Sequence, residues 1–461
     1  MESPVSRSPL ALVRHGLRSG LRRALTLLPR RLRFALIRRM VVCDPAPPAA
    51  LVVKIAETAE ELEACFALLH DAYVHEGFMQ PHPSGLRVTP WHALPTTTTI
   101  CATFDGQVVG TLSMVREGVF GLPLQSAFEL GHVRARPGQV AEISALAVHR
   151  GWRRTGGTVL FPLMKFMYAY CTQHFDTRHL VIAVNPDRIE LYEALLLFER
   201  LDARRVDRYA FANGAPAVGA TLDLAHAPQR FAEVYGGRRR ERDLHHYFTR
   251  LQLPNLQLPA RRYFTTNDPV MTPALLDHFF NRRTAGFAAL NERQRRLLHQ
   301  IYDGPAYAAV LPACESAASD DGVRLRCNTR HSIRFPARIT VPGPGGVRRL
   351  GVLREISATG CQFEVVPMGA AQGLAPGQDG ALQVQLGEGL HAEVRARVVR
   401  SVFPGVWGLA VDTPDAAWRR CVAALEQGQT FRDLAASAAA DAGGAAPQAA
   451  PAGRAPEALS A

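Results

Sequence analysis

Arginine and glycine residues gather in one turn of the sequence, within the stretch Ala141–Gly157. Arg153 and Arg154 precede Gly156 and Gly157, between an apolar strand-like run and a helix-like one. A turn of this kind points backbone N–H groups and a helix N-terminus at an anion, and guanidinium groups add charge where a phosphate would sit. We therefore predict a site for a phosphate-bearing ligand here, and a merely solvated turn is the weaker alternative.

Three polar side chains follow in order around this turn. Glu142 lies on the preceding strand, Asn185 ends the next strand, and Tyr192 lies on the helix after it. This order resembles the GNAT acyltransferases, in which two strands splay apart to hold the pantetheine arm of the acyl donor. The turn departs from the usual GNAT pattern because Thr158 replaces its final glycine or alanine. A relaxed loop suits the single phosphodiester of acyl carrier protein better than the nucleotide of coenzyme A.

The resemblance implies a role for each group in acyl transfer from a thioester to an amine. The amine must be neutral to attack, so we expect Glu142 to act as the base or to position the amine. Backbone N–H groups from Leu146 to Val148 would stabilise the oxyanion. Tyr192 would protonate the leaving thiolate, and Asn185 would hold the pantetheine amide. An ordinary strand-end charge at Glu142 and a packed aromatic at Tyr192 are the structural alternatives.

Further segments narrow the resemblance to the N-acyl amino acid synthases, which are relatives of the acyl-homoserine lactone synthases. These segments are His70–Phe78, Gly110–Ser113, Gly121–Pro123, Glu129–Arg134, Asn185–Pro186, Arg262–Phe264 and Met271–Pro273. Together they cover about residues 51–305. The resemblance implies an acyl-phosphopantetheine donor (acyl carrier protein or acyl-CoA), an amino acid acceptor and no tightly bound cofactor.

Toward the C-terminus, an arginine pair precedes a short polar motif. Arg330 and Arg334 form an Arg-x-x-x-Arg pair, and Glu355, Ser357 and Gly360 follow as Glu-x-Ser-x-x-Gly. Two guanidinium groups can fork onto phosphates and guanine edges, serine adds a hydroxyl, and glycine lets the backbone approach closely. Both motifs resemble those of the PilZ domain, which implies cyclic di-GMP binding. Glutamate replaces the usual aspartate or asparagine, so a barrel that no longer binds nucleotide is the alternative.

The elements that must position these residues change character along the chain. From residue 51 to 312, strand-like and helix-like runs alternate, which predicts a GNAT-like α/β domain with a mixed sheet flanked by helices. From residue 321 to 430, six short runs of period two predict an all-β, six-stranded PilZ-like barrel. We assign residues 1–50 to a basic leader and proline-rich linker, and 434–461 to a disordered Ala/Gly/Pro tail.

The spacing of apolar residues also predicts individual elements. In the first domain we expect strands at Leu51–Ile55, Thr96–Phe104, Val108–Val115, Gln139–Val148, Leu180–Val184 and Pro216–Leu224. We expect helices at Ala59–Phe78, Thr158–His174, Arg188–Glu199 and Asn291–Tyr302. The barrel strands are expected at Arg338–Val341, Leu350–Ile356, Cys361–Val365, Leu382–Leu386, Ala392–Val399 and Val406–Val411.

Charge and cysteine usage bear on partners and compartment. Residues 1–50 carry ten arginines against two acidic residues, on a leucine-striped helical pattern. That pattern predicts an interfacial helix over residues 1–42 on an anionic membrane surface, with an unstructured arginine-rich tail as the alternative. The eight cysteines contain no Cys-x-x-Cys pair, so neither a metal site nor a disulfide framework is indicated. The basic excess lacks interleaved aromatic residues, so we expect no nucleic-acid partner.

These patterns together predict a cytoplasmic N-acyltransferase, either free or peripheral at the inner face of the membrane. It would acylate an amino acid from acyl carrier protein under control of cyclic di-GMP. The main alternative is a non-enzymatic cyclic di-GMP effector in which the GNAT-like fold is only a scaffold. A protein acetyltransferase that uses coenzyme A is a third interpretation, which tight binding to coenzyme A would favour.

Overall fold

The computed structural model of this chain describes residues 28–153, 155–175, 177–202, 205–259, 271–302, 305–314, 331–342, 346–366, 374–387, 390–403 and 405–426. Several features singled out above lie outside these ranges: Arg154, Arg330, Arg262–Phe264, the leader up to Leu27 and the tail 434–461. The described residues form two compact units, one from nearly all of those before residue 315 and one from those after residue 330.

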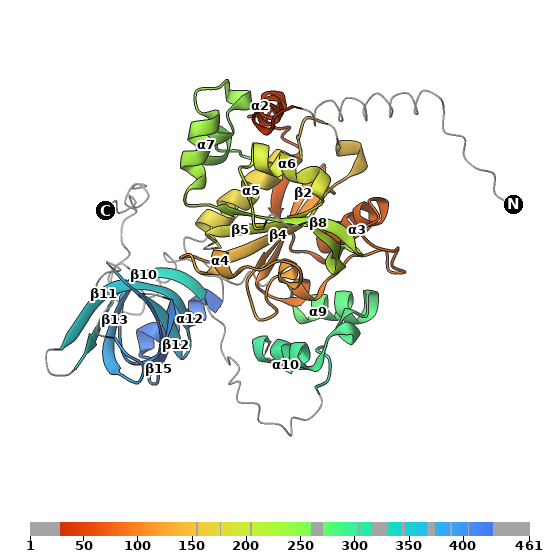
Figure 1. Cartoon of the computed structure of the whole chain (residues 1–461). Helices are drawn as coiled ribbons and strands as arrows, with labels where there is room; N and C mark the ends of the chain where they lie inside the picture. Colours follow the sequence, from red (N-terminus) through yellow and green to blue (C-terminus); the bar gives the residue numbers. More distant parts are fainter. Residues whose placement is uncertain are drawn as a thin grey trace, which may run out of the picture. The chain divides into compact units, whose positions relative to one another are not determined.

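The first unit is built on a mixed sheet, as predicted, and this sheet has nine strands, more than the six that the sequence pattern indicated (Figure 1). Its strands are β1 (Leu51–Ile55), β2 (Thr97–Phe104), β3 (Gln107–Arg116), β4 (Val140–Val148), β5 (His179–Val184), β6 (Glu199–Arg200), β7 (Val206–Tyr209), β8 (Ala215–Asp223) and β9 (Leu256–Gln257). The strand order is β6-β8-β5-β4-β3-β2-β1-β9, with β7 paired to β8. β4 and β5 are parallel, as are β1 and β9, and the other pairs are antiparallel.

Two local signals in the sequence fix how this sheet begins. The tight turn between β2 and β3 is made by Asp105 and Gly106, whose φ angles of 48° and 79° are the left-handed values that a two-residue hairpin requires. The helix after β1 begins where Thr58 and Glu61 close a capping box, each side chain accepting a hydrogen bond from the other residue's backbone. Both features follow from short-range chemistry.

Helices flank the sheet, as the alternating pattern predicted. They are α2 (Arg30–Met40), α3 (Ala59–His75), α4 (Gly131–Arg134), α5 (Leu160–Gln173), α6 (Pro186–Leu195), α7 (Ala227–Tyr235), α8 (Leu244–Thr249), α9 (Pro273–Leu276), α10 (Glu292–Ile301) and α11 (Pro305–Ala308), with a π-helix at Asp277–Arg283. The apolar face of α3, including Leu62 and Phe66, packs with Phe279 and Leu298 in one buried cluster. Side chains from the segment 271–311, far from α3 in sequence, therefore hold α3 in place.

The helix that carries Tyr192 is shorter than predicted. α6 ends at Leu195 and not at Glu199. Leu197 has a φ of 59°, which turns the chain into the short strand β6. The sequence pattern also missed α7, α8, β7 and β9, because runs this short or irregular show no clear period.

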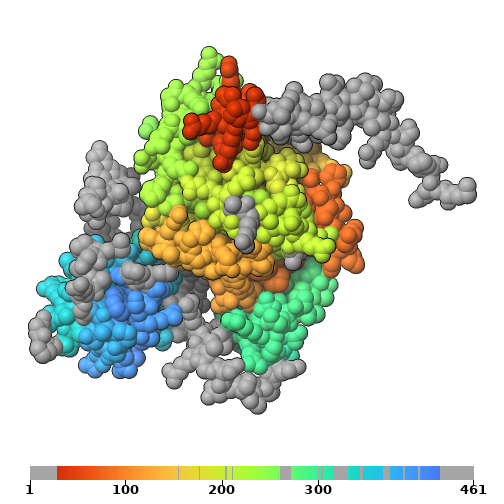
Figure 2. Space-filling view, in the orientation of Figure 1, coloured from red at the N-terminus to blue at the C-terminus, as the bar shows by residue number. Residues whose placement is uncertain are grey.

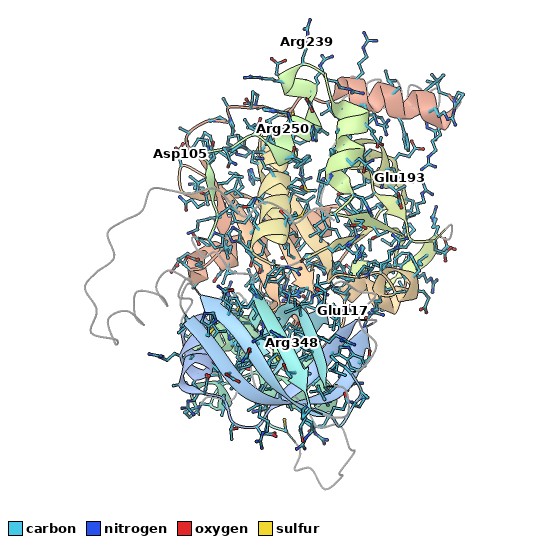
Figure 3. All side chains as sticks on the ribbon, turned by 90° about the vertical axis from the view of Figure 1, so that its left-hand side faces the viewer. Asp105, Glu117, Glu193, Arg239, Arg250 and Arg348 are labelled. Atoms are coloured by element: carbon cyan, nitrogen blue, oxygen red, sulfur yellow. The ribbon has the colours of Figure 1, made fainter. Side chains whose placement is uncertain are left out.

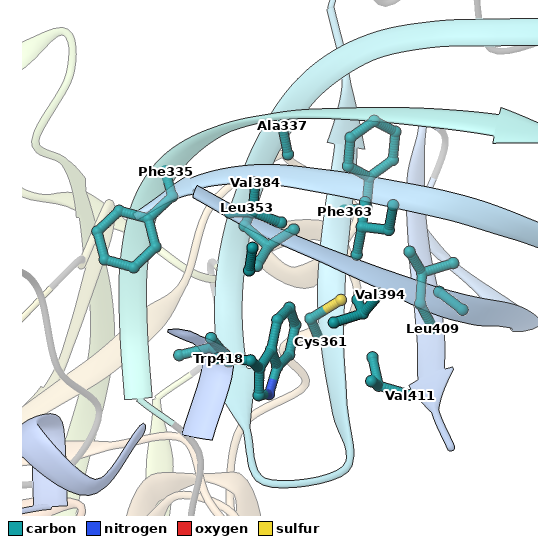
Figure 4. Packing of buried hydrophobic residues seen from close by; sticks show 14 of the residues in the cluster. Phe335, Ala337, Leu353, Cys361, Phe363, Val384, Val394, Leu409, Val411 and Trp418 are labelled. Atoms are coloured by element: carbon teal, nitrogen blue, oxygen red, sulfur yellow. The ribbon is translucent and has the colours of Figure 1, made fainter. Parts of the chain in front are cut away.

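The second unit is a closed antiparallel barrel of six strands, as predicted. The strands are β10 (His331–Val341), β11 (Val347–Ser357), β12 (Gly360–Val365), β13 (Asp379–Gly387), β14 (Leu390–Phe403) and β15 (Val406–Val411). A helix that the sequence pattern missed, α12 (Ala416–Glu426), completes the core. Its Trp418 is fully buried among barrel side chains, and the indole N–H donates to the Ser357 carbonyl at 3.0 Å (Figure 4).

The first barrel strand begins earlier than predicted. β10 starts at His331 and not at Arg338, so Arg334 lies inside the strand and not before it. The burial pattern explains the difference, because Ile333 and Phe335 are buried and Arg334 between them is exposed. The alternation of period two therefore extends upstream of the predicted start.

Candidate functional site

A cavity of about 360 Å³ lies in the first unit where β4 and β5 part. The two strands pair only along Val140–Glu142 and His179–Val181. From the end of this pairing onward, both strands contribute to the cavity wall, β4 through residues 142–146 and β5 through residues 182–184. Strands held together at one end and parted at the other leave backbone groups that an extended substrate arm can bind.

A β-bulge in β4 shapes the wall next to Glu142. Ala145 and Leu146 of β4 both face the single residue Leu112 of β3, and Ala145 has a φ of 54°. A bulge leaves backbone groups outside the ladder and changes their direction, often beside active sites. Leu146 lines the cavity, whereas Val148 is paired with β3 and does not.

The Glu142 carboxyl is a buried acid in the cavity wall. The residue is only 2% exposed, and its Oε2 accepts a hydrogen bond from the Leu124 N–H at 2.8 Å. Burial raises the pKa of this carboxyl to about 8, and the Leu124 N–H lowers it by a smaller amount. Glu142 is therefore not an exposed strand-end charge. A carboxyl with a pKa near neutrality can accept a proton from an amine.

This burial predicts how stability depends on pH. Between the ordinary value of 4.5 and the raised pKa of about 8, the folded protein keeps a Glu142 proton that the unfolded chain releases. The free energy of unfolding should therefore fall as pH rises through this interval, by at most about 1.4 kcal/mol per pH unit. Chemical denaturation at several pH values should show Glu142→Gln gaining stability relative to wild type as pH rises. A constant difference between the two proteins would contradict the raised pKa.

Two predicted residues, Asn185 and Tyr192, reach the cavity from α6. Asn185 is the N-cap of this helix, and its Oδ1 accepts a hydrogen bond from the Asp187 N–H at 2.9 Å. Tyr192 packs edge-on against Phe198 with ring centroids 6.1 Å apart, and burial raises the pKa of its phenol. A phenol with a raised pKa stays protonated at neutral pH, as a proton donor to a thiolate must.

The basic turn lies outside the cavity lining. Arg153 donates from Nε to the Val148 carbonyl at 2.9 Å, and its Nη1 lies 3.8 Å from a Glu76 carboxylate oxygen. Gly156 and Gly157 have φ angles of 70° and 90°, so this turn requires glycine. The turn residues thus lie at the junction of β4 and α5, and the cavity collects four other predicted residues: Glu142, Leu146, Asn185 and Tyr192.

Sequence patterns missed several residues of the cavity wall. Tyr73 on α3, Tyr209 at the end of β7 and Phe211 just after it all line the cavity. Tyr73 falls within a segment that resembles the N-acyl amino acid synthases, so its position was a usable signal. Tyr209 and Phe211 lie on a short strand and in a single 3-10 turn, which have no periodicity to reveal them.

In the barrel, the polar motif lies where β11 turns into β12. Glu355 and Ser357 are buried at the end of β11, and Gly360 opens β12. The Ser357 hydroxyl donates to the Gly360 carbonyl at 3.0 Å, and Glu355 accepts a hydrogen bond from the Gln362 amide at 2.6 Å. The motif therefore shapes the β11–β12 turn.

Strand pairing brings Arg334 close to this motif. Arg334 is exposed on β10, two residues from Ser332, which pairs with Glu355. An exposed guanidinium of this kind fits an anionic nucleotide. Gly360 also has a structural role, because a Cβ there would lie 2.8 Å from the Leu409 carbonyl of β15. Close packing of two strands requires this glycine.

No group of three or more His, Cys, Asp or Glu side chains is placed to hold a metal ion in the part of the chain that the structure describes. The groups that can hold a ligand are the backbone and side chains of the β4–β5 cavity, the β4–α5 turn and the arginine of β10.

Comparisons with known proteins divide the chain into the same two parts as the structure does. Residues 64–223 match the family model of the N-acyl amino acid synthase FeeM, and residues 324–425 match the PilZ domain. No curated protein matches the sequence. Among solved structures, the chain is similar to FeeM, an N-acyl amino acid synthase from uncultured soil microbes, with 24% identity over 40% of this chain and 95% of that chain and a TM-score of 0.33.

Two other solved structures are similar to the chain at lower sequence identity. The acyl-homoserine lactone synthase LasI has 19% identity over 41% of this chain and 98% of its own, with a TM-score of 0.32. An acetyltransferase of the GNAT family from Streptococcus pneumoniae has 12% identity over 38% of this chain and 98% of its own, with a TM-score of 0.27.

The two matched ranges contain the two candidate sites. The first includes the cavity residues Glu142 and Tyr192, and the second includes the barrel motif from Arg334 to Gly360. The predicted fold classes, a GNAT-like mixed α/β domain and a six-stranded PilZ barrel, are confirmed. The chain therefore carries an N-acyl amino acid synthase domain of the FeeM family, followed by a PilZ domain.

Proposed function

We propose that this chain transfers a fatty acyl group from acyl carrier protein to the amine of an amino acid, under regulation by cyclic di-GMP. One observation carries the catalytic part. Glu142 is a buried carboxyl with a pKa of about 8 in the wall of the β4–β5 cavity, within a domain that matches the N-acyl amino acid synthases.

In the proposed reaction, the ionised form of Glu142, whose share rises as pH approaches its pKa of about 8, takes one proton from the acceptor ammonium. The neutral amine then attacks the thioester carbonyl. The C–N bond forms, and the carbonyl oxygen becomes an oxyanion that N–H groups of the β4 bulge, including that of Leu146, stabilise. Collapse of this intermediate breaks the C–S bond, and Tyr192 donates its proton to the departing thiolate. A second proton from the former ammonium then returns to the Tyr192 oxygen. Glu142 releases the proton that it took first to solvent.

A small apolar cavity supports a fatty acyl group as the one transferred. Its volume is about 30 Å³, and it shares Met164 and Phe198 with the main cavity. Its lining includes Met167, Phe231 and Phe248 and no charged side chain. Methionine side chains are flexible, so the apolar space can widen as an acyl chain enters. An acetyl group, which is the alternative acyl group, is too short to reach this small cavity.

The β4–α5 turn favours acyl carrier protein over coenzyme A as the donor. The Thr158 hydroxyl, which stands where a small residue is usual, donates a hydrogen bond to the Thr155 carbonyl at 2.7 Å. Arg153 donates a hydrogen bond to the Val148 carbonyl and forms an ion pair with Glu76. Groups that are already engaged leave fewer donors for a pyrophosphate. The carrier protein presents a single phosphodiester, which needs fewer hydrogen-bond donors from this turn than a pyrophosphate does.

Cyclic di-GMP is proposed as the regulatory ligand because residues 324–425 match the PilZ domain and Arg334 is exposed beside its polar motif. Regulation requires that the nucleotide favour one state of the whole chain over another. Measuring the acyl transfer rate with and without nucleotide therefore separates a regulator of catalysis from a sensor of another kind.

The end of the basic leader is held on the synthase domain. Arg30 of α2 lies 2.6 Å from the Glu193 carboxylate, and Arg38 Nε donates to the Ala194 carbonyl at 2.8 Å (Glu193 is labelled in Figure 3). Both partners belong to α6, the helix that carries Tyr192. One face of α2 is therefore fixed against the catalytic domain through its arginines.

The other face of α2 supports a peripheral membrane contact. Leu32, Leu36 and Met40 are 56%, 39% and 74% exposed on this helix, which lies on the surface of its domain (red in Figure 2). The exposed arginines of 238–242 lie at its C-terminal end, where Arg238 donates to the Arg38 carbonyl at 3.4 Å. Apolar side chains beside arginines suit an anionic lipid surface. None of the described helices is long and apolar enough to cross a membrane.

Replacing Leu32, Leu36 and Met40 with serine should lower partitioning of the protein into the membrane pellet by at least about tenfold. Each buried apolar side chain contributes about 1 kcal/mol or more, and about 1.4 kcal/mol is a factor of ten. Deleting residues 1–42 should have the same effect, and high salt should weaken pelleting of the wild type. Leu350→Ser, which changes an exposed leucine of the barrel, is the matched control. A wild type that is already soluble at low salt would exclude the membrane contact.

The proposed reaction is tested by comparing lipid extracts of cells that express the wild-type chain or Glu142→Ala. We expect acylated amino acids by mass spectrometry with the wild type and not with the variant. A non-enzymatic cyclic di-GMP effector would leave the two extracts identical.

A further inference from the structure

Arg87 is held between the rings of Tyr73 and Phe211, two residues of the main cavity wall, and lines a smaller adjoining chamber. It lies in the loop between α3 and the 3-10 turn Pro90–Ala93, with Cζ 4.1 Å from the Tyr73 ring centroid and 4.8 Å from that of Phe211. Nη2 donates to the Phe211 carbonyl at 2.8 Å, and Nη1 lies 3.9 Å from the Met79 sulfur. Tyr73 and Phe211 both line the main cavity, so the guanidinium is fixed at its edge.

This guanidinium has no counter-charge in the described protein. No Asp or Glu of the described residues forms an ion pair with Arg87, and its Nε is buried without a hydrogen-bond partner among them. Burial lowers the pKa of Arg87 and Tyr73 raises it, but an arginine remains charged at neutral pH. A charge removed from water without a partner is costly. Such a group is suited to receive an anion that arrives with the substrate.

Half of the residues that line the chamber beside Arg87 are polar, and none of them is acidic. The chamber has a volume of about 10 Å³, and its polar lining is Arg87, Thr89, His92, Ser113 and Ser144. His92 is neutral because burial, together with the charge of Arg87, lowers its pKa to about 3. The chamber and the main cavity share Ser144, Ala145 and Phe211. Space for little more than one water suits the end of a larger ligand that enters from the main cavity.

Arg87 and Glu142 adjoin the same cavity from different elements. Tyr73, whose ring lies against the Arg87 guanidinium, lines the main cavity together with Glu142. Ser144 and Ala145, which follow Glu142 on β4, line the chamber that contains Arg87. An amino acid carries its ammonium and its carboxylate on a single carbon, so a ligand of this class presents both charges within a few ångströms.

We propose that Arg87 binds the α-carboxylate of the amino acid acceptor while Glu142 receives a proton from its ammonium. The inference rests on the proposed function, and it names the residue that selects the substrate class. Amines without a neighbouring carboxylate, such as polyamines or protein lysine side chains, would leave Arg87 without an anion and would be poor acceptors. The guanidinium fork can bind both carboxylate oxygens, which an ammonium cannot do with the same geometry.

The test is equilibrium binding of two product-like probes, N-dodecanoylglycine and N-dodecanoylglycinamide, to the full chain. The probes differ only in the carboxylate. The wild type should bind the acid about ten- to a hundredfold more tightly than the amide, the range expected for one charge-assisted bidentate contact. Arg87→Met should bring this ratio close to one, mainly by weakening binding of the acid. Arg87→Lys should give an intermediate ratio.

The matched control is Arg136→Met, which removes an exposed arginine that does not line the cavity and should leave the ratio unchanged. Equal affinity of the wild type for the two probes would overturn the proposal, and so would an unchanged ratio in folded Arg87→Met. A preference of the wild type for the acid is not decisive by itself, because Arg188 also lines the main cavity. If Arg87→Met does not fold, the ratio measured with Arg87→Lys, which keeps the positive charge, supplies the test. A failure of the proposed function shows itself differently, as absence of N-acyl product from an acylated carrier protein even though the acid probe is preferred.

Discussion

Glu142→Gln in the purified chain should lower the rate of N-acyl amino acid formation by about 10²–10⁴-fold while the protein remains folded. Loss of one positioned base typically costs this much. Folding should be retained because the native carboxyl is largely protonated below its pKa of about 8, and a glutamine oxygen can still accept the Leu124 N–H bond. The measurement is the initial rate of product formation at saturating donor, with the melting temperature as the check on folding.

Glu233→Gln is the matched control, since Glu233 is exposed on α7 and does not line the cavity. It should keep the wild-type rate. Glu142→Asp should fall between the two, because it restores a carboxyl but moves it by one methylene. Unchanged turnover in Glu142→Gln would rule out Glu142 as the base.

Arg334→Ala in the full chain should weaken cyclic di-GMP binding about ten- to a hundredfold. A guanidinium that makes charge-assisted, partly bidentate contacts with a nucleotide contributes about 1–3 kcal/mol, and about 1.4 kcal/mol is tenfold in affinity. Arg334 is exposed on β10 beside the buried Glu355, so its removal leaves the barrel core intact. Arg330→Ala should have a similar effect. Isothermal titration measures both.

Arg348→Ala is the matched control for charge, because Arg348 is exposed on β11 and pairs with Thr340, whereas Glu355 of the polar motif pairs with Ser332 (Arg348 is labelled in Figure 3). It should bind nucleotide like the wild type. Glu355→Asp should tighten binding if the extra methylene displaces the carboxylate from a guanine edge. No binding by the wild type at micromolar nucleotide would identify the barrel as an interaction module without a ligand.

The parts of the fold that sequence predicts well are those in which short-range chemistry decides the outcome. The Asp105–Gly106 turn joins β2 and β3 because both residues tolerate left-handed backbone angles. Period-two runs between glycine and proline turns predict the six barrel strands. The order of strand, basic turn and helix around Gly156 and Gly157 predicts the β4–α5 junction for the same reason.

The cavity wall is harder to predict because it depends on contacts between distant segments. Nothing local marks Ala145 for a φ of 54°, which comes from the extra residue of β4 opposite Leu112. Arg87 is a single arginine in a loop, and no sequence pattern distinguishes it from other arginines. Its position between the rings of Tyr73 and Phe211, which are far apart in sequence, is known only from the fold. The predicted roles of Glu142, Asn185 and Tyr192 remain predictions, now with positions around one cavity.

α12 illustrates a different limit. Its sequence, Ala416–Glu426, is short and directly follows strands of period two, so the change of period is brief. Burial of Trp418 in the barrel stabilises the helix, and the Trp418 indole bond to the Ser357 carbonyl links it to the polar motif. Such a helix depends on tertiary packing more than on its own propensity.

Acyl transfer at the β4–β5 cavity is tested most directly by mass spectrometry of one reaction in the purified full chain. The reaction contains a long-chain acyl carrier protein and the twenty common amino acids, with acyl-CoA in a parallel arm. We expect an N-acyl amino acid and an equal amount of free carrier-protein thiol, faster than with acyl-CoA, and neither product at a comparable rate with Glu142→Gln. Release of thiol without an N-acyl amino acid, or no turnover of either donor by the wild type, would contradict the proposed reaction.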